Sequence, residues 1–288
     1  MLFFTVLVFI LLGVEGEKVI ASNGMPIKYL AVFNIFCIVI PSVAVNLIAV
    51  RAYNYKRSAG VLFLGVGFWV SGLGSFLGTG MLLLSGSINV LVTIHNFGVL
   101  VSAVCFVASS WLLTAKHQYV FFQRLYLHPI FHGVALVLMV GIALAAQAGI
   151  LPAFFLQDNG PTIIRQFVLL VSIVLYWQSV VLLIVKYRVV RNAFLLWYAL
   201  SLTAITFGLM IIMHQHNLGS TVNLLGRTVQ YLGHIFALVA VWLANKYARD
   251  VNIPLSQVIA EFFWDAEENY QALVETAKVA IISVDTHG

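Results

Sequence analysis

Seven long apolar segments dominate this sequence and limit what it can fold into. Each is close to the roughly twenty residues that a helix needs to cross a bilayer. Over the whole chain, 62% of the residues are hydrophobic and only 9% are charged, too few to cover a soluble domain of 288 residues. The fold class predicted is an all-α polytopic membrane protein, a bundle of seven transmembrane helices surrounded by the lipid bilayer. We expect the spans at residues 29–50, 61–84, 90–115, 129–150, 163–185, 193–213 and 222–245.

The loops between these segments differ in their content of Lys and Arg, and the difference alternates along the chain. One side carries ten such residues: Arg51, Lys56, Arg57, Lys116, Arg124, Lys186, Arg188, Arg191, Lys246 and Arg249. The other carries four: Lys18, Lys28, Arg165 and Arg227. Because basic loops stay in the cytoplasm, we predict a multi-pass protein of the inner (plasma) membrane with a cytoplasmic C-terminus. The net charge of +5 follows this topology and indicates no nucleic-acid partner.

The N-terminal segment, residues 1–28, begins with about fourteen apolar residues, fewer than a span needs. A signal peptide has an apolar core of this length, but no basic residues precede it here. Two interpretations stay open, a signal-like segment and a short extra hydrophobic segment.

The second span has small residues on one face. Gly67, Ser71, Gly74 and Gly78 recur at helical spacing, and glycines four residues apart let a neighbouring backbone approach closely. We interpret this face as a helix-packing surface.

The segment after the last span changes composition. From Met25 to Arg249 the only acid is Asp158, whereas seven of the ten acids lie from Asp250 onward. For residues 248–272 we predict a cytoplasmic signalling helix, started by Pro254, whose apolar positions repeat at spacings of four and three. The predicted seam consists of Leu255, Ile259, Phe262, Ala266, Asn269 and Leu273. This pattern indicates a coiled coil with one polar core position, and hence a homodimer; an amphipathic helix on the membrane surface is the alternative.

Polar side chains gather in the outer half of the predicted bundle. The last span carries Asn223, Arg227, Gln230 and His234 on one helical face, and in lipid such a face must turn inward. The candidate ligand-binding residues are His95, Asn96, Arg227, Gln230 and His234, lining a pocket between the third, sixth and seventh spans. Interhelical hydrogen bonds without any ligand are the alternative.

Arg227 needs a partner inside the membrane because a charged side chain is costly there. A small anionic ligand held by this guanidinium is one hypothesis. Asp158, or outward extension of Arg227 to the lipid headgroups, could neutralise the charge instead.

No cofactor is required by the sequence. His214 and His216, with His95 or His234 nearby, make a metal or haem iron a minor hypothesis. Catalytic motifs are absent from the sequence, so we expect no enzymatic activity in this chain.

The C-terminal residues carry a resemblance to a known family. Tyr270-x-x-Leu273-Val274-Glu275-x-Ala277, followed by Ala280-Ile281-Ile282-x-Val284-Asp285-x-x-Gly288, resembles the opening of a PAS domain. The β-branched run and the turn residues after it agree with a first strand. Residues 273–288 are therefore expected to start a PAS domain that is incomplete here.

A second resemblance covers residues 29–247. Thr93-Ile-His95-Asn96-Phe-Gly98, and Tyr231-Leu-Gly-His234 followed by Pro254, resemble the multi-span input regions of prokaryotic sensor proteins, of the MASE-like and seven-helix input types. The resemblance implies signal transduction in a two-component phosphorelay or cyclic-di-GMP pathway, with a histidine kinase or diguanylate cyclase beyond Gly288. A small-solute transporter or channel is the alternative, and it predicts broken helices and a site at the membrane midplane.

Overall fold

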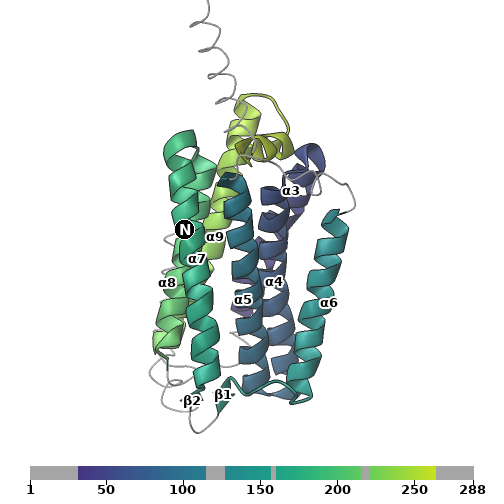
Figure 1. Ribbon diagram of the computed structural model, residues 1–288, viewed down its shortest axis with the longest axis vertical. Coiled ribbons are helices and arrows are strands. Elements are labelled where there is room, and N and C mark those ends of the chain that lie inside the picture. Colours follow the sequence, from purple (N-terminus) through teal and green to yellow (C-terminus); the bar gives the residue numbers. More distant parts are fainter. Residues whose placement is uncertain (1–31, 115–126, 157–159, 216–220, 264–288) are drawn as a thin grey trace, which may run out of the picture.

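The computed structural model describes residues 32–114, 127–156, 160–215 and 221–263. Within these residues, seven helices are long and apolar enough to cross a membrane. They stand side by side as one bundle (Figure 1). The N-terminal segment 1–28, Asn269 and the PAS-like residues 273–288 lie outside the described residues.

The helix bounds follow the predicted spans closely. The first span combines a π-helical turn, η1 (Ile35–Val39), with α3 (Ile40–Lys56). The others are α4 (Ala59–Ser85), α5 (Ile88–Thr114), α6 (Leu127–Gln147), α7 (Ile163–Val190), α8 (Ala193–Met213) and α9 (Thr221–Asp250). Helices α7 and α9 each run about a turn beyond the predicted end, because basic and aromatic residues prolong the helix after the apolar stretch has stopped.

Six of the spans form a closed ring. Each of α3, α4, α5, α7, α8 and α9 packs against the next in that order, and α9 returns to α3. Helix α6 lies outside the ring against α4 and α5 (Figure 1). Its Met139 side chain, which is fully buried, reaches the point where α4 and α5 meet.

Glycines bring two pairs of helices into backbone contact. A Cβ atom on Gly74 of α4 would lie 3.1 Å from the Cα of Gly98 in α5, which confirms the packing face predicted for the second span. Helices α8 and α9 approach even more closely, since a Cβ atom on Gly208 would lie 2.6 Å from the carbonyl oxygen of Gly226. Helices α8 and α9 therefore form a tightly joined pair.

A short hairpin closes one end of the bundle. Strands β1 (Phe155–Leu156) and β2 (Gly160–Pro161) pair in antiparallel fashion between α6 and α7. The amide groups of Phe154 and Phe155 both donate to Asn89 Oδ1, at 2.8 and 3.0 Å. This anchors the hairpin to the start of α5, and we call this side of the molecule the hairpin end.

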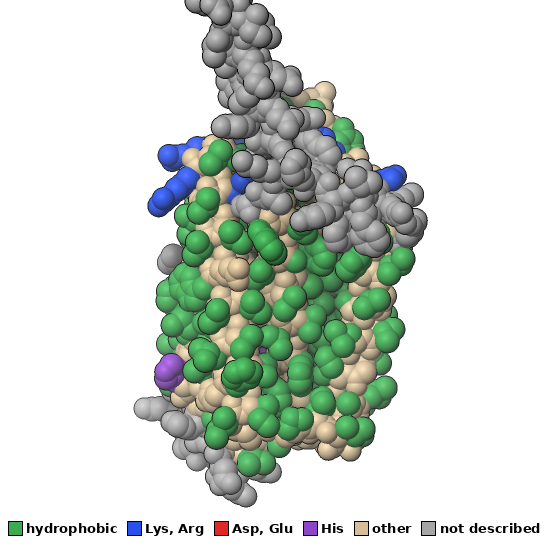
Figure 2. All heavy atoms as spheres, in the orientation of Figure 1, with side chains coloured by type: hydrophobic (Ala, Val, Ile, Leu, Met, Phe, Trp, Pro, Cys, Tyr) green, Lys and Arg blue, Asp and Glu red, His purple; other side chains and the backbone are tan. Residues whose placement is uncertain are grey.

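The opposite end is basic. Figure 2 shows the Lys and Arg side chains gathered where α9 ends. Of the described basic residues, those away from this basic end are Arg165 and Arg227, and both are buried.

The chain leaves α9 at the basic end and turns back onto the bundle. Residues 255–263 are helical after Pro254, and we call this segment the exit helix. Val258, Ile259 and Ala260 are each no more than 2% exposed. Phe263 packs against Phe194 with ring centroids 6.1 Å apart.

The described part of the exit helix carries three positions of the predicted dimer seam, Leu255, Ile259 and Phe262. Ile259 is buried in the core of this chain's own bundle, and Leu255 and Phe262 are partly buried against that core. The dimer seam stays a prediction; in the single chain, Phe262 packs against Phe194 of α8 and Phe263 lies against Gly60 at the start of α4.

Candidate functional site

Five strongly polar side chains converge inside the bundle toward the hairpin end, and we call them the polar cluster. They are His95 from α5, Arg165 from α7, and Arg227, Gln230 and His234 from α9. His95 lies within electrostatic range of Arg227, His234 and Arg165, and the two arginines lie within range of each other. The four charged or ionisable groups therefore share one site, although three different helices supply them.

Arg165 is placed by the first turn of α7. Thr162 caps this helix, its side-chain oxygen accepting a hydrogen bond from the Arg165 amide at 3.4 Å. The same hydroxyl donates to the carbonyl of Ala153, which ties the helix start to the hairpin. The guanidinium then turns into the bundle, where the residue is 1% exposed. Its Nη2 donates to the Ile212 carbonyl at 3.4 Å, a long hydrogen bond, and its Nε and Nη1 have no partner among the described residues.

Arg227 enters the same site from the second turn of α9. It is 5% exposed, and its Nε and Nη1 also lack a partner in the part of the chain that the structure describes. One turn further along α9, Tyr231 carries a buried hydroxyl. That hydroxyl donates to Asn34 Oδ1 at 2.9 Å, and Asn34 Nδ2 donates to Thr79 Oγ1 at 3.0 Å. A chain of hydrogen bonds thus links α9, one turn from Arg227, to the first span and to α4.

A π turn helps to place Asn34 in this chain. Pro41 has no amide hydrogen and would clash with the carbonyl four residues earlier in a regular helix. The wider turn at Ile35–Val39, closed by a bond from the Ile40 amide to the Ile35 carbonyl, accommodates it. Asn34 lies just before this turn and is 1% exposed.

His234 is held from both sides. Its Nδ1 lies 2.9 Å from the Gln230 carbonyl, and since a carbonyl oxygen only accepts, Nδ1 is the donor. Its Nε2 lies 3.0 Å from the Ser71 hydroxyl of α4. The ring edge also meets Phe68, with centroids 6.4 Å apart. These contacts fix the orientation of the imidazole.

Several neutral groups around the arginines are buried without hydrogen bonds. Within the described residues, His95 Nε2, Asn96 Nδ2 and Gln230 Oε1 have no partner. Buried polar groups in folded proteins are nearly always paired, so each exception calls for an explanation. Unpaired buried atoms also occur elsewhere in the described bundle, for example at Ser110, Tyr198 and Ser201, but the permanently charged side chains among them are the two arginines.

No described acid neutralises these guanidinium groups. The acids within the described residues are Asp250 and Glu261, at the basic end of the bundle. Asp158, the partner suggested for Arg227 from the sequence, lies outside the described residues. Outward extension to lipid headgroups is not observed, since the Arg227 Nε and Nη1 atoms are covered by protein.

Four of the five members of the polar cluster were candidate ligand-binding residues on the sequence alone, and their binding role stays a prediction. The shared inward face of the last span is confirmed, since Asn223, Arg227, Gln230 and His234 are each less than 10% exposed. Asn96, which follows His95 in α5, is also buried. The sixth span supplies backbone carbonyls, from Ile212 and Met213 to Arg165 and Gln166.

Arg165 was missed because, at the outer end of the predicted span 163–185, it was counted only among the basic residues of the outer side. A signal was present in the sequence: the buried polar residues of α7 recur with helical spacing at Arg165, Ser172, Tyr176 and Ser179. That spacing places Arg165 on the inward face of the helix.

The histidines suggested for a metal are not part of the cluster. His214 is exposed at the end of α8, and its Nδ1 lies 2.8 Å from the Met210 carbonyl of its own helix. His216 lies outside the described residues. Among the residues that the structure describes, no group of three or more His, Cys, Asp or Glu side chains could hold a metal ion.

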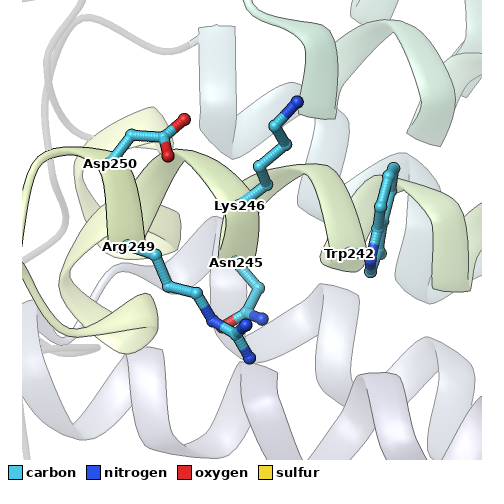
Figure 3. A pocket seen from close by; sticks show the side chains of 5 residues that line it. All are labelled: Trp242, Asn245, Lys246, Arg249 and Asp250. Carbon is cyan, nitrogen blue, oxygen red and sulfur yellow. The ribbon is translucent and has the colours of Figure 1, made fainter.

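A pocket at the basic end was not anticipated from the sequence. It encloses about 220 Å³ and is lined by Trp242, Asn245, Lys246, Arg249 and Asp250 (Figure 3). All five side chains come from α9, so the pocket does not bring together groups from separate helices as the polar cluster does.

The fold and the cluster together define a polytopic membrane protein with a charged site inside a seven-helix bundle. A family model described as a membrane-associated sensor domain, MASE3, matches residues 29–245. The chain belongs to this family. No curated protein and no solved structure matches it.

Proposed function

We propose that this chain is the signal-input module of a signal-transduction protein, relaying an extracytoplasmic or membrane stimulus to a cytoplasmic output. Membership of a membrane-associated sensor family supports the input role. The observation that carries the relay is the course of α9. This one helix, Thr221–Asp250, bears Arg227, Gln230 and His234 near one end and leads into the exit helix at the other.

The output in this proposal lies beyond the membrane. The PAS-like residues 273–288 support a PAS domain there, followed by a histidine kinase or diguanylate cyclase. A movement of α9 would reach it through the exit helix, whose packing on Phe194 and Gly60 is sensitive to small displacements. The cytoplasmic location of the C-terminus rests on the distribution of Lys and Arg.

The residues that the structure describes show no feature that favours the transporter alternative. Transporters of known types build their sites from interrupted helices near the membrane midplane. Within the described residues each span is continuous, with a π turn in the first and no break at the polar cluster.

A fusion experiment tests the proposal. The whole chain is joined after Gly288 to a diguanylate cyclase domain, and cyclic-di-GMP is measured in cells. We expect His234→Gln to change the output several-fold, because it alters the side chain through which α9 contacts Ser71 and Phe68 of α4. Leu225→Ala, on the exposed face of the same helix, is the matched control and should behave like wild type. Equal output from both variants and wild type, at equal amounts in the membrane, would rule out the relay.

A further inference from the structure

We propose that the polar cluster is an oxyanion-binding site, in which Arg165 and Arg227 together hold the carboxylate or phosphate group of a small ligand. The signalling role of this ligand rests on the function proposed above, but the binding itself does not.

Charge is the first argument. Arg165 and Arg227 are 1% and 5% exposed, they lie within electrostatic range of each other, and both acids of the described chain are at the opposite end. Arginine stays protonated in proteins, so proton loss cannot remove these two charges. Two like charges buried together are unfavourable unless an anion joins them.

Geometry is the second argument. The arginines enter from α7 and α9, so their guanidinium groups approach the site from different helices. Each keeps an Nε and an Nη1 without a hydrogen bond among the described residues. Guanidinium nitrogens match carboxylate and phosphate oxygens in both charge and geometry, which explains the frequent use of Arg in such sites. One turn from Arg227, the hydrogen bond from the Tyr231 hydroxyl to Asn34 ties this part of α9 to the first span.

The neutral groups around the arginines give the third argument. His95 Nε2, Asn96 Nδ2 and Gln230 Oε1 are all buried without partners in the described part of the chain. His95 lies within electrostatic range of both arginines, and Gln230 lies one turn from Arg227 on α9. Only a ligand larger than a halide ion could meet these two groups and the guanidinium groups together. An oxyanion is therefore a better fit than chloride, which offers a single point of contact.

The same chemistry is available from two sources, a soluble anion and the headgroup of an anionic lipid. Thermal unfolding of the purified chain, followed by the fluorescence of its six Trp residues, separates them. In nanodiscs of phosphatidylcholine, sodium phosphate and sodium succinate are each compared with sodium chloride at equal ionic strength. A further arm uses nanodiscs containing phosphatidylglycerol in chloride buffer.

We expect at least one of these probes to raise the unfolding midpoint, by roughly 5 °C or more at a concentration about 100 times its dissociation constant. Arg165→Gln and Arg227→Gln should each abolish the shift. Arg188→Gln removes the same charge from an exposed position at the basic end and should retain it. A shift with phosphatidylglycerol alone identifies a lipid headgroup, whereas a shift with phosphate or succinate identifies a soluble ligand.

The absence of a shift in every arm, or an equal shift in all three variants, would overturn the proposal. A second measurement tests whether an ion pair with Asp158, instead of a ligand, neutralises the arginines. In chloride alone, removal of one of two repelling charges should leave the midpoint unchanged or raise it. If Arg165→Gln and Asp158→Asn instead lower it by similar amounts, Asp158 neutralises the site and no ligand is needed.

Failure of this inference is distinguishable from failure of the proposed function. Binding is measured on the purified chain without any output domain. If a probe binds but the cyclase fusion never responds to site variants, the oxyanion site stands and the relay is wrong. If the fusion responds to site variants but no probe binds, the relay stands and the oxyanion site is wrong.

Discussion

The Ser71 hydroxyl of α4 lies 3.0 Å from Nε2 of His234 in α9, although α4 and α9 are not neighbours in the packing order of the ring. The hydrogen bond therefore spans the interior of the bundle. It joins α9, which carries Arg227, to α4, which packs against α3, α5 and α6.

Ser71→Ala should destabilise the protein by about 1 kcal/mol, because His234 Nε2 loses its partner in a buried site. The free energy of unfolding in mixed micelles checks this. Ser85→Ala is the control, since the Ser85 hydroxyl is exposed and donates to its own helix at Met81. The combined Ser71→Ala/His234→Phe variant should lose less than the sum of the single variants. Additive losses would show that the two side chains do not interact.

Gly208→Ala should separate α8 from α9. The added methyl group would lie 2.6 Å from the Gly226 carbonyl oxygen, and backbone cannot move aside as a side chain can. We expect a loss of about 1–3 kcal/mol in the free energy of unfolding. Gly141→Ala in α6 meets nothing within 4 Å and should cost little. Similar losses from both substitutions would contradict the close contact.

The topology is open to a direct test. A reporter active only in the cytoplasm should work when fused after Arg57, Arg191 or Arg249, and fail after Ser87 or Asn217. The basis is the gathering of Lys and Arg at one end of the bundle (Figure 2). Activity after Asn217 would reverse the orientation and place the polar cluster near the cytoplasm.

Hydropathy and small-residue spacing were enough to predict the bundle. The limits of α8 match the predicted span 193–213, and the packing face around Gly74 was found from its spacing alone. Both properties are local, because the length of an apolar run and the recurrence of glycine depend on one segment at a time.

The site was predicted less completely because it depends on contacts between segments. Arg227 was assigned to the site through its own helix, whereas Arg165 stands at the start of the predicted span 163–185, where hydropathy does not show which way a side chain turns. Its inward turn depends on the Thr162 cap and on the hairpin anchored by Asn89. The burial of Ile259 likewise depends on the return of the chain at Pro254, and the heptad spacing alone fits a dimer seam equally well.

The docking of the exit helix gives the last prediction. With Cys37 and Cys105 replaced by Ala, a single cysteine at Ile259 should react with a maleimide about tenfold more slowly than one at Val251, because Ile259 is 2% exposed and Val251 is 42% exposed. Phe263→Ala should accelerate the reaction at position 259, since Phe263 packs against Phe194 and the face of α4 at Gly60.

Two outcomes separate docking from a coiled coil. Slow labelling at position 259, released by Phe263→Ala, supports a helix held on its own bundle. Rapid crosslinking of Ile259→Cys between protomers, with no effect of Phe263→Ala, would instead support the dimer seam. If the docked form and the dimeric form both exist, an oxyanion bound in the polar cluster should change their ratio, because α9 connects the cluster to the exit helix. The ratio changes only if the oxyanion binds one of the two forms more tightly than the other.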